Sequence, residues 1–218
     1  FRVKDSPGII SYVGLPEAVK HHTGLALEDS EDALKLATRL VGLMDEYATQ
    51  SQQSLRLLSS CIPFEPTAKR LTSLDVAAGY LKAKTAVPYT EQSNLPLSTA
   101  IPLKTRLKIE ELFQQLTRGG HLFDIRLDEP FPTEEVLANY TKRMIETTGI
   151  GLLTFTRDLT YCYHCRTVSY GFWQKCPKCG YDGNRSVYYS KTYGKCKSSR
   201  AWSPEERNFA THNQRFKI

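Results

Sequence analysis

Two Cys-x-x-Cys pairs constrain the C-terminal part of this chain more strongly than any other feature of its sequence. The pairs are Cys162 with Cys165 and Cys176 with Cys179, and ten residues separate them. A Cys-x-x-Cys turn places both sulfurs on one side of the backbone, so two such turns can surround one tetrahedral zinc ion. Gly180 follows the second pair, where an open backbone conformation is needed. Because four thiolates leave no position for water, we expect a structural zinc site without Lewis-acid catalysis.

The cysteine spacing by itself also leaves a redox-active dithiol or an iron–sulfur cluster open. His164 could replace one thiol as a ligand, but four better ligands are present, so we expect His164 at the surface. The two remaining cysteines, Cys61 and Cys196, stand apart from the pairs. We expect Cys61 to be a buried or loop thiol and Cys196 to be a bystander.

The start of the sequence and its hydropathy favour a reducing, cytoplasmic location without a membrane segment. Residues 1–8 lack the apolar stretch of a signal peptide, and no apolar run approaches the length of a bilayer crossing. Paired cysteines in this context indicate metal binding rather than disulfides. Because the sequence has no initiator methionine, we expect a fragment, a processed chain or a chain with further residues upstream of Phe1.

The positive charge of the chain is concentrated in its last quarter. The formal net charge is +6 for the whole chain. Residues 161–218 contain 11 Lys and Arg against 3 Asp and Glu, whereas residues 1–160 contain 18 against 20. A basic tail can bind nucleic acid or nucleotide phosphates. The alternative, which the absence of an Arg-rich run favours, is that zinc-bound thiolates offset part of the charge.

The spacing of apolar residues predicts several helices. The clearest runs from Glu31 to about Gln53 behind Ser30, a good N-cap residue. We expect its apolar face in the core, and this face consists of Leu34, Ala37, Leu40, Val41, Met44 and Tyr47. Another begins at Thr133 with acidic residues in its first turn. Its expected buried face consists of Leu137, Tyr140, Met144 and Ile145. Shorter helices are expected over residues 15–22, 67–81 and 107–116.

Two segments on either side of the helix at Thr133 are typical of strands. Residues 121–127 alternate in polarity, and residues 151–156 are apolar and β-branched, as in a buried strand. A helix joins them, so we expect a βαβ unit with parallel strands. Residues 187–196 are typical of a strand running into a loop at Gly194. By composition alone, Gly194 is an ordinary turn glycine.

Several short motifs follow one another along nearly the whole chain. They are Ser6–Ile10 with Gly14–Val19, Tyr89-Thr90 with Leu95–Leu97, Gly119–His121 with Asp128–Pro130, Thr148–Gly151, and Phe155–Thr160. The two cysteine pairs come next in the same order. Together these motifs resemble the C-terminal part of the anaerobic (class III) ribonucleoside-triphosphate reductases.

This resemblance implies a fold and a domain organisation. The family folds as a ten-stranded α/β barrel of the glycyl-radical type, with a C-terminal loop that carries the radical. We therefore expect part of such a barrel over residues 1–158, a zinc-ribbon-like module over 159–186, and the radical loop with a basic tail over 187–218. Trp202 lies at the family's distance beyond the radical glycine, which implies that Gly194 is the radical site.

The resemblance also implies the chemistry and the partners. In the family, an activating enzyme with an iron–sulfur cluster and S-adenosylmethionine abstracts a hydrogen from the glycine. The radical then passes to a cysteine, whose thiyl form removes the 3′ hydrogen of a ribonucleoside triphosphate. That cysteine lies upstream of everything in this sequence. The chain would therefore act with a missing N-terminal half, in the same chain or as a separate subunit, and as a homodimer, while zinc holds the loop that delivers Gly194 into the barrel.

Three positions depart from the family's pattern. Lys191 and Lys195 stand where the family has Arg and Tyr around the glycine, and Glu91 stands where it tends to have Asn. These departures leave an alternative, a catalytically lapsed zinc-binding paralogue that binds a protein or RNA partner through its basic tail. An upstream half-barrel with a cysteine loop would favour the enzyme.

Overall fold

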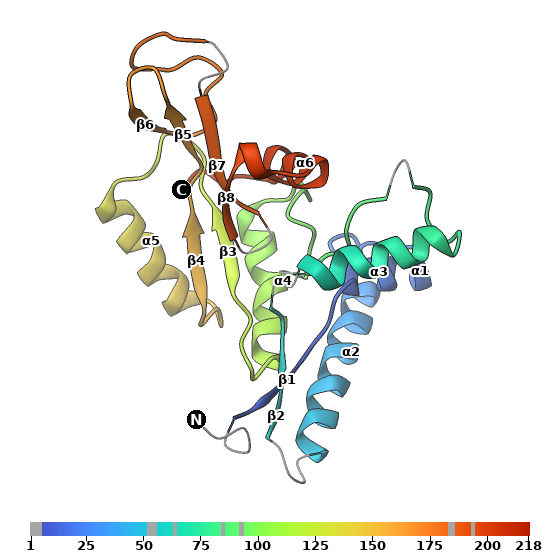
Figure 1. The fold of residues 1–218 in the computed structure, drawn as a ribbon. Coiled ribbons are helices and arrows are strands. Elements are labelled where there is room, and N and C mark those ends of the chain that lie inside the picture. The colour runs from blue at the N-terminus through green and yellow to red at the C-terminus, as the bar shows by residue number, and fades with distance from the viewer. Residues whose placement is uncertain are drawn as a thin grey trace. The chain divides into compact units, whose positions relative to one another are not determined.

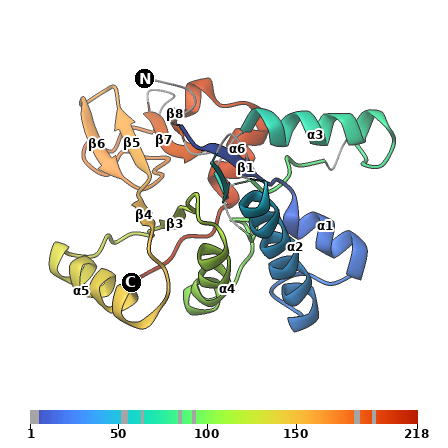
Figure 2. The same cartoon turned by 90° about the horizontal axis from the view of Figure 1, so that it is seen from below.

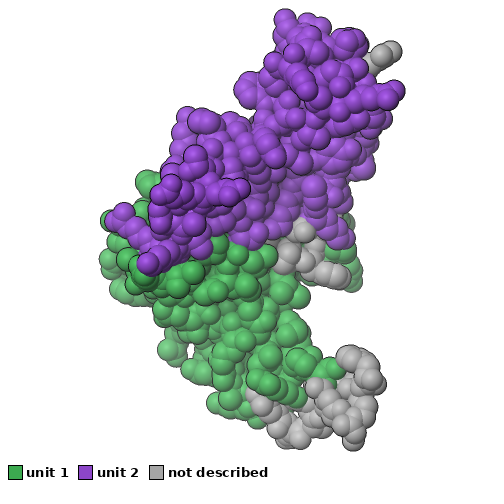
Figure 3. Space-filling view, turned by 90° about the vertical axis from the view of Figure 1, so that its left-hand side faces the viewer, with its two compact units in different colours: residues 1–123, 144–153 green, residues 124–143, 154–218 purple. Residues whose placement is uncertain are grey.

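A computed structural model describes residues 6–51, 56–62, 65–83, 86–91, 94–182, 186–192 and 195–218. The chain divides into two compact units (Figure 3). Unit 1 contains residues 1–123 and 144–153, and unit 2 contains residues 124–143 and 154–218. None of the helices in the described ranges combines the length and the apolar character that a bilayer crossing requires.

Unit 1 begins with a parallel pair of short strands, β1 (Gly8–Ser11) and β2 (Leu57–Ser60). Gly8 lies opposite Leu57, and Ser11 lies opposite Ser60. The sequence does not predict either strand, because each has four residues and neither alternates in polarity. Two helices connect the strands, as parallel pairing requires.

Helices form the apolar core of unit 1. α2 (Glu31–Gln50) packs against β2 and against α1 (Leu15–Thr23) and α4 (Leu103–Leu116) (Figures 1 and 2). The Ser30 hydroxyl accepts a hydrogen bond from the Ala33 amide and caps α2, as predicted. The core side chains come from these helices and the loop before α4: Val19, Ala33, Ala37, Val41, Leu95 and Phe113.

Two expectations for the helices of unit 1 need revision. The predicted helix over 67–81 is α3 (Glu65–Ala77), which begins and ends earlier. On α2, Leu40 and Tyr47 are 43% and 66% exposed, although the helical spacing placed both on the core face. The inward face instead follows small residues such as Ala37 and Ala48, which let α2 approach its neighbours closely. The predicted end of this helix at Gln53 falls outside the described residues.

The predicted βαβ unit is present as β3 (Phe123–Arg126), α5 (Glu134–Thr147) and β4 (Leu153–Thr156). The Phe123 amide donates to the Leu152 carbonyl, and the Leu127 amide donates to the Thr156 carbonyl. From the first bond to the second, the donor and the acceptor both lie further toward the C-terminus. The strands are therefore parallel, as predicted. The boundary between the units runs through all three elements.

Burial within this βαβ unit differs from the sequence-based expectation. All four residues of β3 are buried, although strands that alternate in polarity commonly expose one face. β4 was expected to be buried and is half-buried along its length. On α5, Met144 is buried and Leu137 and Tyr140 are half-buried, but Ile145 is 61% exposed. The prediction for Ile145 was wrong, because the buried face of α5 is narrower than the face over which its apolar residues are spread.

Unit 2 contains a four-stranded antiparallel sheet in the order β6-β5-β7-β8 (Figure 1). Its strands are β5 (Leu159–Cys162), β6 (Thr167–Tyr170), β7 (Ser186–Thr192) and β8 (Lys195–Ser198). The strand expected at residues 187–196 is thus two strands of one hairpin, which pair with Thr192 opposite Lys195.

The last residues of unit 2 are ordered by a local signal that motif analysis missed. A 3-10 turn, η2 (Ser199–Ala201), precedes α6 (Pro204–His212). Ser203 and Glu206 form a capping box at the start of α6, with Pro204 at the first helical position. Beyond the helix, Phe216 pairs in parallel with Leu127, next to β3.

A buried polar cluster holds the loop before α4 inside unit 1. The Glu110 carboxylate on α4 lies 3.1 Å from Nε2 of His121, and both side chains are fully buried. Asn94 donates to Glu110 over 2.9 Å and accepts a hydrogen bond from the Tyr12 hydroxyl over 2.6 Å. Burial raises the pKa of Glu110, but the hydrogen bonds from His121 and Asn94 and the nearby charges outweigh burial and hold it below its ordinary value.

This cluster predicts a specific acid dependence of stability. A carboxylate with a depressed folded pKa stabilises the fold above the unfolded pKa of about 4.3, and that stabilisation is lost as pH falls through the folded pKa. Glu110→Gln should therefore lower the free energy of unfolding by about 3 kcal/mol at pH 7, with a smaller difference at pH 3. Urea titrations at both pH values measure this. The exposed Glu46→Gln serves as the control, and a Glu110→Gln cost that is independent of pH would contradict the prediction.

Packing in the core predicts a contrast between two adjacent residues of α4. Phe113 is fully buried, whereas Leu112 is 40% exposed. Phe113→Ala should lower the free energy of unfolding by about 3–5 kcal/mol. Leu112→Ala should cost less than about 1 kcal/mol, because it leaves no cavity. Chemical unfolding of both variants distinguishes them, and equal costs would show that α4 packs in another orientation.

Candidate metal centre

The two predicted cysteine pairs lie in the turns of the antiparallel sheet of unit 2. Cys162 is the last residue of β5 and pairs with Thr167 of β6 on one side and Ser186 of β7 on the other. The first pair therefore lies in the turn from β5 to β6. In that turn, Arg166 adopts a φ of 56°, which is uncommon for a residue with a side chain. Sheet pairing thus fixes Cys162, while the turn brings Cys165 back beside it.

Backbone hydrogen bonds shape the second cysteine pair. The Cys176 amide donates to the Tyr181 carbonyl over 2.8 Å, and the Gly180 amide donates to the Cys176 carbonyl over 2.9 Å. Gly180 has a φ of 72°, the left-handed conformation that its position after the second cysteine predicted. The turn folds back on itself and directs its two thiols toward the first pair.

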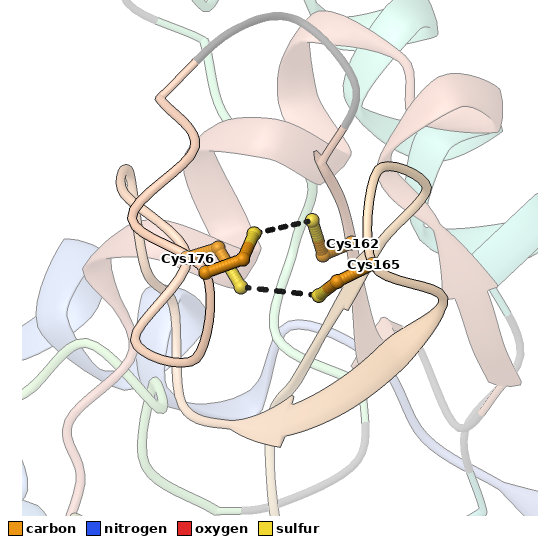
Figure 4. Close-up of side chains that lie close together, drawn as sticks. Cys162, Cys165 and Cys176 are labelled. Carbon is orange, nitrogen blue, oxygen red and sulfur yellow. Dashed lines mark hydrogen bonds between the residues drawn. The ribbon is translucent and has the colours of Figure 1, made fainter.

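All four sulfurs lie within 4.8 Å of one another. The Cys162 and Cys179 sulfurs are 3.9 Å apart, and the Cys165 and Cys176 sulfurs are 3.7 Å apart. Figure 4 shows the thiols of Cys162, Cys165 and Cys176 turned toward one another. Zinc–sulfur bonds of about 2.3 Å require tetrahedral sulfur–sulfur separations of about 3.8 Å. The cluster therefore has the donor type, number and spacing that fit a zinc ion.

Hydrogen bonds favour the thiolate form of two cysteines in this cluster. The Thr167 hydroxyl, 2.9 Å from the Cys165 sulfur, is the main cause that lowers the pKa of Cys165 to about 6. The backbone amides of Cys179 and Lys178 lower the pKa of Cys176. For Cys179, the backbone amide of Tyr181 lowers the pKa, but desolvation and the three neighbouring thiols outweigh it and raise this pKa to about 12. Four thiols this close repel one another when ionised, and a bound cation would relieve that repulsion. His164 is exposed, as expected, stacks on Tyr181 at 4.8 Å between ring centroids, and is not part of the cluster.

The other residues singled out from the sequence lie apart from this cluster or outside the described residues. Gly194 is outside them, and its described neighbours Thr192 and Lys195 are paired residues of β7 and β8. Cys61 follows β2 in unit 1, and burial raises the pKa of its thiol to about 12, as expected for a buried, inert thiol. Cys196 is exposed on β8.

The fold and the cluster define a mixed α/β chain with a four-cysteine site near its C-terminus. A family model described as anaerobic ribonucleoside-triphosphate reductase matches residues 4–211. The chain belongs to this family.

Solved structures agree in fold. A structure described as anaerobic ribonucleotide reductase is 20% identical, with a TM-score of 0.80, and the match covers 99% of this chain and 35% of that one. The Thermotoga maritima anaerobic ribonucleotide reductase with MES in the active site is 21% identical over 91% of this chain and 33% of that one, with a TM-score of 0.73. The Thermotoga maritima enzyme in complex with dATP and CTP is 18% identical over 90% and 32% of the two chains, with a TM-score of 0.70. This chain thus spans about a third of their length. No curated protein matches it significantly.

The geometry predicts which cysteines retain metal. Cys176→Ser replaces a buried thiol of the cluster with a hydroxyl, so purified protein should contain less than about a tenth of the parent zinc per chain. Cys196→Ser, outside the cluster, should keep the full zinc content. Mass spectrometry of bound metals measures both. Iron instead of zinc in the parent, or zinc retained by Cys176→Ser, would contradict a four-thiolate zinc site.

Proposed function

We propose that this chain is the C-terminal portion of an enzyme that converts ribonucleoside triphosphates to deoxyribonucleoside triphosphates through glycyl and thiyl radicals. The family match over residues 4–211 is the observation that carries this proposal. The likeness in fold to solved anaerobic reductases over 90–99% of this chain supports it. The complex of the Thermotoga maritima enzyme with dATP and CTP supports nucleoside triphosphates as the substrate class.

The cysteine cluster has a structural role in this proposal. Cys162, Cys165, Cys176 and Cys179 would hold a zinc ion with all coordination positions filled by sulfur. Bound zinc would link the β5–β6 turn to the segment before β7 and stabilise the sheet. Because β5 pairs directly with β7, the cluster supports the strand that ends two residues before Gly194.

Gly194 is the proposed radical site. A radical on an α-carbon is stabilised between the amide nitrogen and the carbonyl group, and a glycine lacks the side chain that would prevent a planar, shielded geometry. An activating enzyme with an iron–sulfur cluster and S-adenosylmethionine would remove the hydrogen atom. The residues described on either side of Gly194 in the sequence, Thr192 and Lys195, are paired residues of β7 and β8. The protein's contribution is to position and shield the radical.

The remaining parts of the reaction require residues beyond this chain. Because the thiyl cysteine of the family lies upstream of the segment that this chain resembles, we assign it to an N-terminal portion of the enzyme. That portion would be either the same chain or a separate subunit. Residues 1–158 would contribute to the barrel, 159–186 the zinc module and 187–218 the radical loop, in a cytoplasmic homodimer.

Oxygen sensitivity tests the proposed radical directly. A glycyl radical reacts with oxygen and the backbone breaks at that glycine. Protein isolated without oxygen from its native cells should be intact, and brief exposure to air should produce a fragment that ends at Gly194. Intact-mass analysis before and after exposure measures this.

Gly194→Ala is the matched control, and it should remain uncut in air while keeping its zinc, because it removes the radical site and leaves the cysteines unchanged. An uncut parent chain that copurifies with no reductase portion would contradict the proposal.

A further inference from the structure

We propose that Asp124 and Arg126 are positioning residues for the strand that leads into Gly194. They hold Ser190 and Lys191 of β7 through an ion pair and two hydrogen bonds. This inference rests on the proposed function, because it concerns how the radical glycine is held. It gives β3 a role beyond its place in the βαβ unit.

Asp124 and Arg126 are two residues apart on β3, so their side chains lie on the same face of the strand. They are 7% and 2% exposed. Buried charged groups are costly unless they have charged or hydrogen-bonding partners. The partners of these two residues therefore determine which segment can pack against this face of β3.

Most of the partners come from the end of β7, and Asp158, which follows β4, adds a carboxylate with Oδ1 3.9 Å from Nη1 of Arg126. Oδ1 of Asp124 lies 3.2 Å from Nζ of Lys191 and also accepts a hydrogen bond from the Thr156 hydroxyl over 2.6 Å. Nη1 of Arg126 donates to the Ser190 hydroxyl over 3.0 Å, and Nη2 donates to the Lys191 carbonyl. One strand therefore holds both the backbone and the side chain of Lys191, three residues before Gly194.

These contacts occur where the sheet itself gives less support. The pairing of β5 with β7 extends from Cys162 opposite Ser186 to Leu159 opposite Tyr189. Beyond Tyr189, the strand pairing described for β7 is with β8, from Ser190 to Thr192. The Arg126 guanidinium is hydrogen-bonded to this last part of β7. Side chains thus hold the strand end for which β5 contributes no paired residue.

The ion pair predicts how substitutions of Lys191 behave. A lysine ammonium is a compact charge that suits a single carboxylate oxygen, which Asp124 supplies. Lys191→Arg should keep this ion pair, whereas Lys191→Met keeps much of the side-chain volume and loses the charge.

The expected consequence is a change in the radical rather than in the metal. In the complete reductase, activated without oxygen, Asp124→Asn and Lys191→Met should each lower the number of glycyl radicals per chain about tenfold, because a displaced strand end misplaces the reacting atom. Lys191→Arg should stay close to the parent. The double variant should be no worse than either single variant, because both remove the same pair. Electron paramagnetic resonance counts the radicals, and bound zinc is measured on the same samples.

Lys197→Met is the matched control. It removes the ion pair of Lys197 with Glu206, which links the same hairpin to α6, and it should keep at least about half of the parent radical. A loss of radical in Lys197→Met as large as that in Asp124→Asn and Lys191→Met would overturn the inference, because removing any ion pair of the hairpin would then have the same effect. Parent-like radical yields in Asp124→Asn and Lys191→Met would also overturn it, while leaving the proposed function intact.

Two further outcomes distinguish a variant that fails to fold from one that folds and misplaces the radical site. If Asp124→Asn loses zinc or unfolds at a lower temperature, Lys191→Met decides the matter, because its side chain is 20% exposed and tolerates substitution better. A fully activated parent that shows no glycyl radical would overturn the proposed function itself, and this inference with it.

Discussion

The antiparallel pairing of β5 with β7 is the constraint on which the rest of unit 2 depends. Cys162 is the last residue of β5 and lies opposite Ser186, so one strand carries a cysteine of the cluster and also aligns β7, which ends at Thr192. A slip of one residue would turn Cys162 to the other face of the sheet and remove it from the cluster. Binding of the proposed zinc ion would therefore select one register, and its free energy would contribute to the free energy of folding of the whole sheet.

Features encoded by neighbouring residues could be predicted from the sequence. The cysteine cluster, the left-handed Gly180 and the N-cap at Ser30 each depend on a few consecutive positions. The contacts of Asp124 and Arg126 with β7 could not be predicted, because Ser190 and Lys191 lie more than sixty residues further along the chain. A strand that alternates charged and apolar residues is usually half-exposed, and only the fold shows that both faces of β3 are buried.

Part of the positive charge of the C-terminal region forms internal ion pairs once the chain is folded. Along the sequence, the excess of Lys and Arg after residue 161 suggested a surface for nucleic acid. In unit 2, Lys191 pairs with Asp124, Arg215 pairs with Asp158, and Lys197 pairs with Glu206. Two of these carboxylates, Asp124 and Asp158, precede residue 161 in the sequence. A charge count that divides the sequence at residue 161 therefore assigns the two members of each pair to different segments, although their charged atoms lie within 3.2 Å of each other. Internal ion pairs thus account for part of the basic character.

Two kinds of interaction hold the β7–β8 hairpin, at opposite ends of β7. The cysteine cluster acts through β5 near Ser186, and the Asp124 and Arg126 contacts act at Ser190 and Lys191. Thiolate ligation depends on metal and on redox state, whereas a buried ion pair depends on charge and is little screened by salt. Because the two supports respond to different conditions, neither can replace the other. For the radical proposed at Gly194, both ends of β7, the strand that precedes it in the sequence, need to be fixed.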